Sequence, residues 1–284
     1  MQPCGLLTAA HCESRLMLLG SPPDMVRRSP LRRAERTGLH NITHAVFHYI
    51  TPESKLQEKN LGKRRVFTKM SEWISEAGEA FAPGEAAARC LENLGRRGFR
   101  ARWFPDRAAC AAALLAEIGT DEAVGIGGSK TIDELGVYDA LVERGNTVWW
   151  HWKARPEDGD VRPKALLSDV FLCSANALME SGEPVSIDGG GNRVAAMFYG
   201  PKRCFIVCGV NKLAPDYDAA IERIKTVACP KNAVRLNMKT PCAKTGRCHE
   251  CAAELRMCRV TVRYSYPMVG RETHVWLVGE ELGF

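Results

Sequence analysis

The chain has 284 residues, 45% hydrophobic and 25% charged, with a formal net charge of +6 at pH 7. This is the composition of a globular protein that can bury a substantial core, and it argues against an intrinsically disordered chain. No apolar run reaches the roughly 18–20 residues that span a bilayer, and no basic stripe carries interleaved aromatic residues, so we expect neither a membrane protein nor a nucleic-acid-binding protein.

Residues 1–69 differ from the rest of the chain. They contain clustered arginines and lack the periodicity of helices and strands. We therefore expect a disordered extension, or an upstream stretch that is not translated, with the true start at Met70. The folded domain is expected to span residues 70–284 and to include a cysteine loop at 240–260.

From residue 71 onward, segments with helical periodicity alternate with short apolar segments. We expect helices at 71–81, 84–98, 106–119, 131–145 and 216–228. We expect strands at 99–104, 123–128, 147–152, 169–174, 194–199 and 204–210. Asp106 is placed to cap the third helix, and Thr131 and Glu134 have the spacing of a capping box for the fourth.

This β-α-β-α order predicts an α/β protein with a doubly wound, mostly parallel sheet and helices on both faces. Parallel strands that are buried on both faces read as nearly continuous apolar runs, as "CFIVCGV" does. Ligands of such folds bind beyond the carboxyl ends of the strands, so the candidate site residues should lie there.

The loop "GIGGSKT" (125–131) follows a predicted strand and opens a predicted helix. Glycines allow backbone N–H groups to approach an anion closely, and the loop adds two hydroxyl groups. A tight strand-to-helix turn that needs small residues is an equally good explanation. The candidate ligand-binding residues of this loop are Gly125, Gly127, Gly128, Ser129 and Thr131.

The segment 174–201 gathers polar residues around three consecutive glycines. Loops of this kind commonly position groups against a ligand, although Asp and Asn also stabilise ordinary turns. Asn211 and Lys212 end the next apolar strand at the same expected edge, whereas we interpret His151, at another strand end, as structural. The candidate binding residues of these segments are Asn176, Asp188, Gly189, Gly191, Asn192, Arg193, Asn211 and Lys212.

Near the carboxyl end, Cys242, Cys248, Cys251 and Cys258 are spaced C-x5-C-x2-C-x6-C. The N-terminus makes a poor signal peptide, so we expect a cytoplasmic, reducing location, where metal binding is favoured over disulfides. Four thiolates satisfy either zinc or a [4Fe–4S] cluster. A redox dithiol at Cys248 and Cys251 is a further alternative.

With these segments in view, the chain resembles the LUD-domain family, named for lactate utilisation. The resemblance runs in order from about residue 71 to the last residue. It is carried by "GIGGSKTIDELG", "SANALMESG", "SIDGGGNRVAAMFYGP", "IVCGVNKL", "AIERIK", "TPCAKTGRC" and "LVGEELGF". It implies a fold similar to the NagB/RpiA/CoA-transferase group, and a cytoplasmic role in oxidising lactate or a related 2-hydroxy acid. It also favours an iron–sulfur cluster over zinc.

Two function classes follow. In the first, the chain binds a small anionic ligand, and iron–sulfur or oxidoreductase partner subunits accept the electrons, because the chain carries no flavin or nicotinamide motif. In the second, the chain is a free-standing transferase or isomerase. "ESG" at Glu180 loosely resembles the catalytic E-N-G turn of related CoA transferases, which makes Glu180 the candidate nucleophile or base. A ligand sensor without catalysis is a third possibility.

Overall fold

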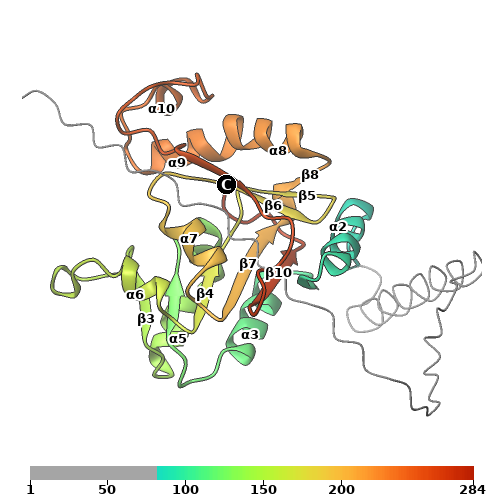
Figure 1. The fold of residues 1–284 in the computed structure, drawn as a ribbon, viewed down its shortest axis with the longest axis vertical. Helices are drawn as coiled ribbons and strands as arrows, with labels where there is room; N and C mark the ends of the chain where they lie inside the picture. Colours follow the sequence, from blue (N-terminus) through green and yellow to red (C-terminus); the bar gives the residue numbers. More distant parts are fainter. Residues whose placement is uncertain (1–81) are drawn as a thin grey trace, which may run out of the picture. The chain divides into compact units, whose positions relative to one another are not determined.

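The computed structural model describes residues 82–284, and a parallel sheet forms its centre (Figure 1). Every pair of neighbouring strands in this sheet is parallel. In spatial order the strands are β1 (Arg100–Phe104), β10 (Glu272–Val278), β7 (Arg203–Gly209), β4 (Val170–Cys173), β2 (Val124–Ile126) and β3 (Val148–Trp150). The predicted α/β class with a mostly parallel sheet is confirmed.

Successive side chains of a strand point to opposite faces of the sheet. The apolar strands therefore present two apolar faces, and helices cover both. In β4, Phe171 and Cys173 belong to one core, and Val170 and Leu172 to the other. The helices that supply buried side chains to the first core are α2 (Glu85–Arg96), α6 (Arg162–Leu166) and α7 (Asn192–Phe198). Those of the second core are α3 (Arg107–Glu117), α4 (Lys130–Leu135) and α5 (Val137–Glu143).

Capping explains where two of these helices begin. The Asp106 carboxylate accepts the Ala109 N–H at 2.8 Å, as predicted for the start of α3. The predicted capping box at residues 131 and 134 is wrong, because the Ser129 hydroxyl caps α4 instead, accepting the Ile132 N–H at 3.2 Å. The predicted helix 131–145 also breaks in two at Gly136, whose φ of +69° is left-handed.

The strand predicted at 194–199 is wrong, because this segment forms most of α7. Gly191 has a φ of +79°, which favours glycine, and its N–H donates to the Asp188 carboxylate at 2.8 Å. This turn reverses the chain after β6 and starts a helix, in which the two alanines are good helix formers.

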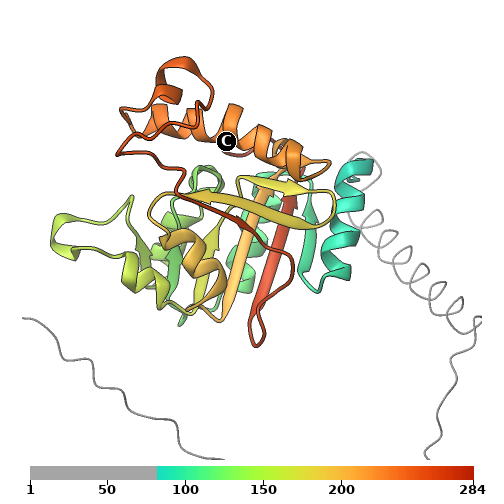
Figure 2. The same cartoon turned by 45° about the horizontal axis from the view of Figure 1, so that its top comes forward.

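A second, smaller sheet was not predicted from the sequence. Its strands in spatial order are β8 (Leu213–Ala214), β5 (Ala177–Met179), β6 (Glu183–Asp188) and β9 (Val260–Arg263). It lies across the carboxyl ends of the large sheet, since β5 and β8 closely follow the ends of β4 and β7 (Figure 2). The helix α8 (Tyr217–Arg223) and the π-helix η4 (Ile224–Ala228) pack over it, and α9 (Cys229–Arg235) continues from η4. The short helix α10 (Pro241–Thr245) packs against α9.

Short 3₁₀ helices η2 (Pro156–Asp158) and η3 (Val210–Lys212) complete the secondary structure of the described residues. Among residues 82–284, none of the helices combines the length and the apolar character that a membrane span requires. The expectations for residues 1–69, for a start at Met70 and for a helix at 71–81 lie outside the described residues.

Candidate functional site

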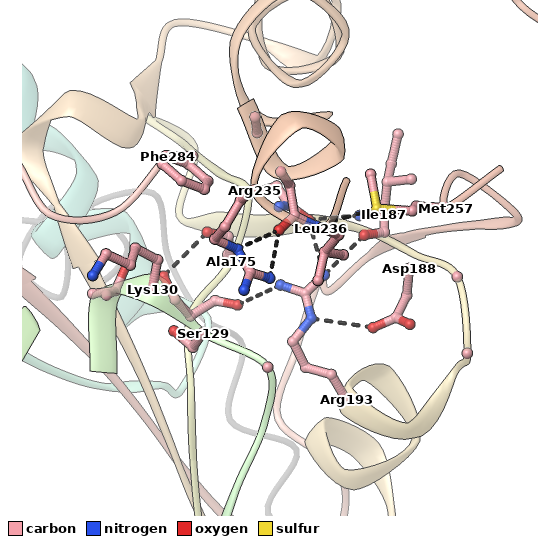
Figure 3. Close-up of a pocket in the computed structure, with 18 of the residues that line it drawn as sticks. Ser129, Lys130, Ala175, Ile187, Asp188, Arg193, Arg235, Leu236, Met257 and Phe284 are labelled. Atoms are coloured by element: carbon pink, nitrogen blue, oxygen red, sulfur yellow. Dashed lines mark hydrogen bonds and ion pairs between the residues drawn. The ribbon is translucent and has the colours of Figure 1, made fainter. Parts of the chain in front are cut away.

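A cavity of about 240 Å³ lies where the small sheet meets the carboxyl ends of the large one. Figure 3 shows Arg193 on one side and Phe284, Arg235 and Leu236 on the other. The lining comes from eight segments that are separate in sequence. It includes Gly128, Ser129, Lys130, Thr131, His151, Trp152, Ser174, Asn176, Asp188, Gly189, Gly190, Asn192, Arg193, Lys212, Asn232, Arg235, Met257 and Phe284.

The glycine loop borders this cavity directly after β2. Gly127 is closely packed, because a Cβ there would lie 3.1 Å from both Arg193 Cγ and Phe171 Cζ. The backbone N–H groups of Gly128 and Ser129 donate to no acceptor within residues 82–284. Two free N–H groups at a cavity wall are suited to hold an oxyanion.

Gly125, a predicted ligand residue, lies inside β2 and does not line the cavity. A Cβ there would overlap the backbone of Ala165, whose Cα would be 2.9 Å away. The glycine is required because α6 packs directly on the strand, which is a structural role.

The buried guanidinium of Arg193 organises the opposite wall. It donates to the Asp188 carboxylate at 3.2 Å, and at 2.9 Å each to the carbonyls of Ser174 and Ile187 and to Asn176 Oδ1. One cation thereby fixes the end of β4, the start of β5 and the end of β6. Asn176, Asp188 and Arg193, which the sequence singled out, are brought together.

The turn after β6 supplies more backbone to the cavity. Gly189 approaches Met257, whose carbonyl oxygen would lie 2.9 Å from a Cβ at that position. The N–H groups of Gly189 and Gly190 have no acceptor in the described part of the chain. Asn192 lines the cavity, whereas Gly191 serves the turn itself.

Lys212 is the second buried cation. Its ammonium donates to Thr131 Oγ1 at 2.7 Å, to Ser174 Oγ at 2.8 Å and to the Ala175 carbonyl at 3.3 Å. Burial lowers the pKa of Lys212 to about 8, and the guanidinium of Arg223 acts in the same direction. The lysine is therefore mostly charged at pH 7, and within residues 82–284 no carboxylate forms an ion pair with it.

The last residues, 282–284, border the cavity. Thr131 Oγ1 donates to the Leu282 carbonyl at 3.2 Å, and the Leu282 N–H donates to Asn211 Oδ1 at 3.2 Å. Asn211 therefore positions the last residues without lining the cavity, and Phe284 reaches its wall. Phe284, Arg235 and Trp152 were not predicted as cavity residues.

Arg235 adds an exposed cation above the cavity. Its guanidinium lies 4.2 Å from the centroid of the Trp152 ring and donates to Asn232 Oδ1 at 2.8 and 3.0 Å. Of the four cationic side chains that line the cavity, Lys130 is paired with Asp133 and Arg193 with Asp188, whereas Lys212 and Arg235 form no ion pair within residues 82–284. The cavity is therefore electropositive and is suited to an anion.

The structure does not bring Glu180 to this cavity. Its carboxylate pairs with Arg89 at 2.9 Å, and its backbone N–H donates to the Ala214 carbonyl at 2.8 Å. The residue lies just after β5, on the side of α2.

The four predicted cysteine ligands converge in the loop that follows α9. Together with Cys229, which the sequence did not single out, they line a second, enclosed space of about 20 Å³. Nitrogen donors approach two of the sulfurs: the Arg256 guanidinium reaches Cys258 Sγ at 3.2 Å, and the Glu250 N–H reaches Cys248 Sγ at 3.4 Å. Hydrogen bonds of this kind stabilise thiolates.

The described residues contain no group of three or more His, Cys, Asp or Glu side chains already positioned around one metal ion. The cysteine sulfurs in the lining fit the donor chemistry of both a cluster and zinc. The space is about large enough for one water molecule, so a [4Fe–4S] cluster requires these side chains to move apart, whereas a zinc ion requires them to move closer together. The cysteine side chains are therefore suitable ligands for a metal ion or a cluster, and the presence and identity of the metal stay a prediction.

The sequence model of the LUD domain matches residues 87–278. Among curated proteins no significant match exists. One solved structure that matches is the crystal structure of a DUF162-family protein from Deinococcus radiodurans, with 15% identity and a TM-score of 0.41. The alignment covers 69% of this chain and all of that one.

Proposed function

Because the chain belongs to the LUD-domain family, which is associated with lactate utilisation, we propose that it is a component of 2-hydroxy-acid oxidation that holds the anionic substrate in the 240 Å³ cavity. The substrate class is lactate or a related 2-hydroxy acid, and the product is the corresponding keto acid. A cytoplasmic location is part of the proposal, and it agrees with the described cysteines, which are all free.

The observation that carries the proposal is the buried ammonium of Lys212. It lies beneath the glycine loop, and its protein partners in the described residues are two hydroxyls and a carbonyl. The Glu134 carboxylate acts on this charge only from beyond ion-pair distance. A buried cation without an ion-paired carboxylate is costly, and a bound carboxylate would offset that cost. Arg193 does not play this part, because Asp188 already neutralises it.

Free backbone donors supply the rest of a carboxylate site. Gly128 and Ser129 line the cavity after β2, and Gly189 and Gly190 line it after β6; the N–H groups of all four have no acceptor in the described part of the chain. The cavity is smaller than the sites of drug-sized ligands, which agrees with a small acid.

We propose further that Cys242, Cys248, Cys251 and Cys258 hold a [4Fe–4S] cluster, with zinc as the alternative. A cluster would supply one-electron transfer at this position, whereas zinc would only stabilise the loop. The loop is close to the substrate cavity, because Met257 lines both spaces. Partner subunits would carry the hydride acceptor.

Glu180 gives the alternative transferase or isomerase little support, since its carboxylate is paired with Arg89 outside the cavity. A non-catalytic sensor would bind the acid but show no turnover when partner subunits are present, whereas our proposal requires turnover under that condition.

The test combines binding with turnover. Equilibrium dialysis with radiolabelled L-lactate should show saturable binding to the purified chain. L-lactate-dependent reduction of an artificial dye should be absent for the chain alone and should appear when its native partner subunits are added. Absence of saturable binding would overturn the substrate assignment, and full turnover by the chain alone would overturn the division of labour.

A further inference from the structure

His151 directly follows β3, and its imidazole lies against the glycine loop. A Cβ on Gly128 would be 3.4 Å from His151 Cε1 and 3.5 Å from its Nε2. The residue lines the cavity with a solvent-exposed side chain that contacts the Trp152 ring, and within residues 82–284 neither ring nitrogen forms a hydrogen bond. The imidazole is thus available to a ligand.

The other titratable groups of the cavity are engaged. Lys130 pairs with Asp133 at 2.7 Å, and Asp188 pairs with Arg193. The Lys212 ammonium has three acceptors, as described above. His151 is therefore the lining side chain, among the described residues, that can exchange a proton without first breaking a contact.

We propose that His151 is the acid–base residue of the cavity and accepts the hydroxyl proton of a bound 2-hydroxy acid. This inference rests on the proposed function. As the O–H bond breaks, its proton moves to the imidazole and the C–O bond becomes C=O. The α-hydrogen leaves with its electron pair as hydride, to an oxidised flavin or nicotinamide carried by a partner subunit.

The electrostatic surroundings agree with this role. Burial lowers the pKa of His151 below its ordinary value, and the guanidinium groups of Arg162 and Arg235 act in the same direction. The carboxylates of Asp160 and Asp188 oppose them. The imidazole is therefore mainly neutral at pH 7 and can accept a proton.

The proposal makes ligand preference depend on pH in one direction. A neutral imidazole accepts a hydrogen bond from the hydroxyl of a 2-hydroxy acid, whereas an imidazolium donates one to the carbonyl of a keto acid. Rising pH should therefore favour L-lactate over pyruvate. The charge on Lys212 acts on both carboxylates alike and cancels in the ratio of the two affinities.

Isothermal titration of the full chain with L-lactate and with pyruvate, between pH 5 and 7.5, tests this. In the unaltered protein the lactate-to-pyruvate affinity ratio should rise about fivefold or more over this range. In His151→Phe and His151→Gln the ratio should not change with pH. Glu157→Gln, an exposed substitution in the same loop, is the control that keeps the original dependence.

The outcomes separate the two proposals. If both acids bind but their ratio is independent of pH, or if the His151 variants keep the dependence, the role of His151 is overturned while the binding site stands. If neither acid binds to the unaltered protein, the proposed function fails and this inference fails with it.

Discussion

Nζ of Lys212 lies 2.7 Å from Oγ1 of Thr131, which joins the residues that follow β7 to the glycine loop that follows β2. Ser174, directly after β4, accepts from the same ammonium at 2.8 Å. These strands are neighbours in the order β7-β4-β2. Three adjacent strand ends therefore meet around one buried charge, at the edge where parallel sheets bind their ligands.

The charge on Lys212 predicts how anion binding depends on pH. Because the pKa of this lysine is about 8, its ammonium is lost as pH rises through that value. The affinity for L-lactate should therefore fall by about tenfold between pH 7 and pH 9, since one charge contact contributes on the order of 1 kcal/mol or more.

Isothermal titration at a series of pH values measures this dependence. Lys212→Met should bind weakly at every pH. Lys153→Gln, which removes a lysine that lies over the rings of Tyr138 and Trp150, is the control with an unchanged profile. Equal affinities at pH 7 and pH 9 in the unaltered protein would contradict the assignment.

Two glycines should respond to alanine in opposite directions. Gly125→Ala should lower the free energy of unfolding by about 2–4 kcal/mol, because the added methyl group overlaps the backbone of Ala165 in a closely packed interior. Gly95→Ala, inside α2 with no atom near the new methyl group, should raise it by about 0.5–1 kcal/mol. Urea denaturation measures both. A Gly125→Ala protein of normal stability would show that α6 does not pack on β2 as described.

Glu180→Gln should have little effect on stability or on L-lactate binding. The substitution removes a partly exposed ion pair with Arg89, which contributes at most about 1 kcal/mol, and it leaves the backbone contacts of residue 180 intact. L-lactate binding should be unaltered, because the side chain lies outside the cavity. Turnover that disappears on this substitution, with binding retained, would instead favour the transferase or isomerase.

The cysteine loop predicts metal content. Protein purified without oxygen should contain close to four iron and four sulfide per chain and absorb broadly near 400 nm, as such clusters do. Cys248→Ser should lose most of the iron. Cys229→Ala should retain it, because the other four cysteines are sufficient ligands, and Cys110→Ala, in the second core, is a control. One zinc per chain without colour would leave the loop with a structural role alone.

The sequence was informative where function depends on short, local patterns. The parallel sheet follows from its apolar runs, and Arg193, Asp188 and Asn176 could be selected because all three lie in one glycine-rich segment. The helix at 194–199 was missed because "VAAMFY" is as apolar as a buried strand. Its helical start depends on the left-handed turn at Gly191, which the spacing does not reveal.

Other residues could not be selected because folding alone brings them together. Nothing in the sequence around Phe284 or Arg235 marks either side chain as a ligand residue, and only the packing of the small sheet and of α9 places them at the cavity. Cys229 precedes the cysteine motif and joins it through the position of α9. His151 is an isolated histidine, which sequence reasoning rightly treats as structural until its neighbours are known.

A crystal structure of the chain grown with L-lactate or pyruvate tests the central claim most directly. We predict density for the acid in the 240 Å³ cavity, with its carboxylate near the N–H groups of Gly128 and Ser129 and on the Lys212 side. An acid bound elsewhere, or an empty cavity at ligand concentrations that saturate binding in solution, would contradict the account.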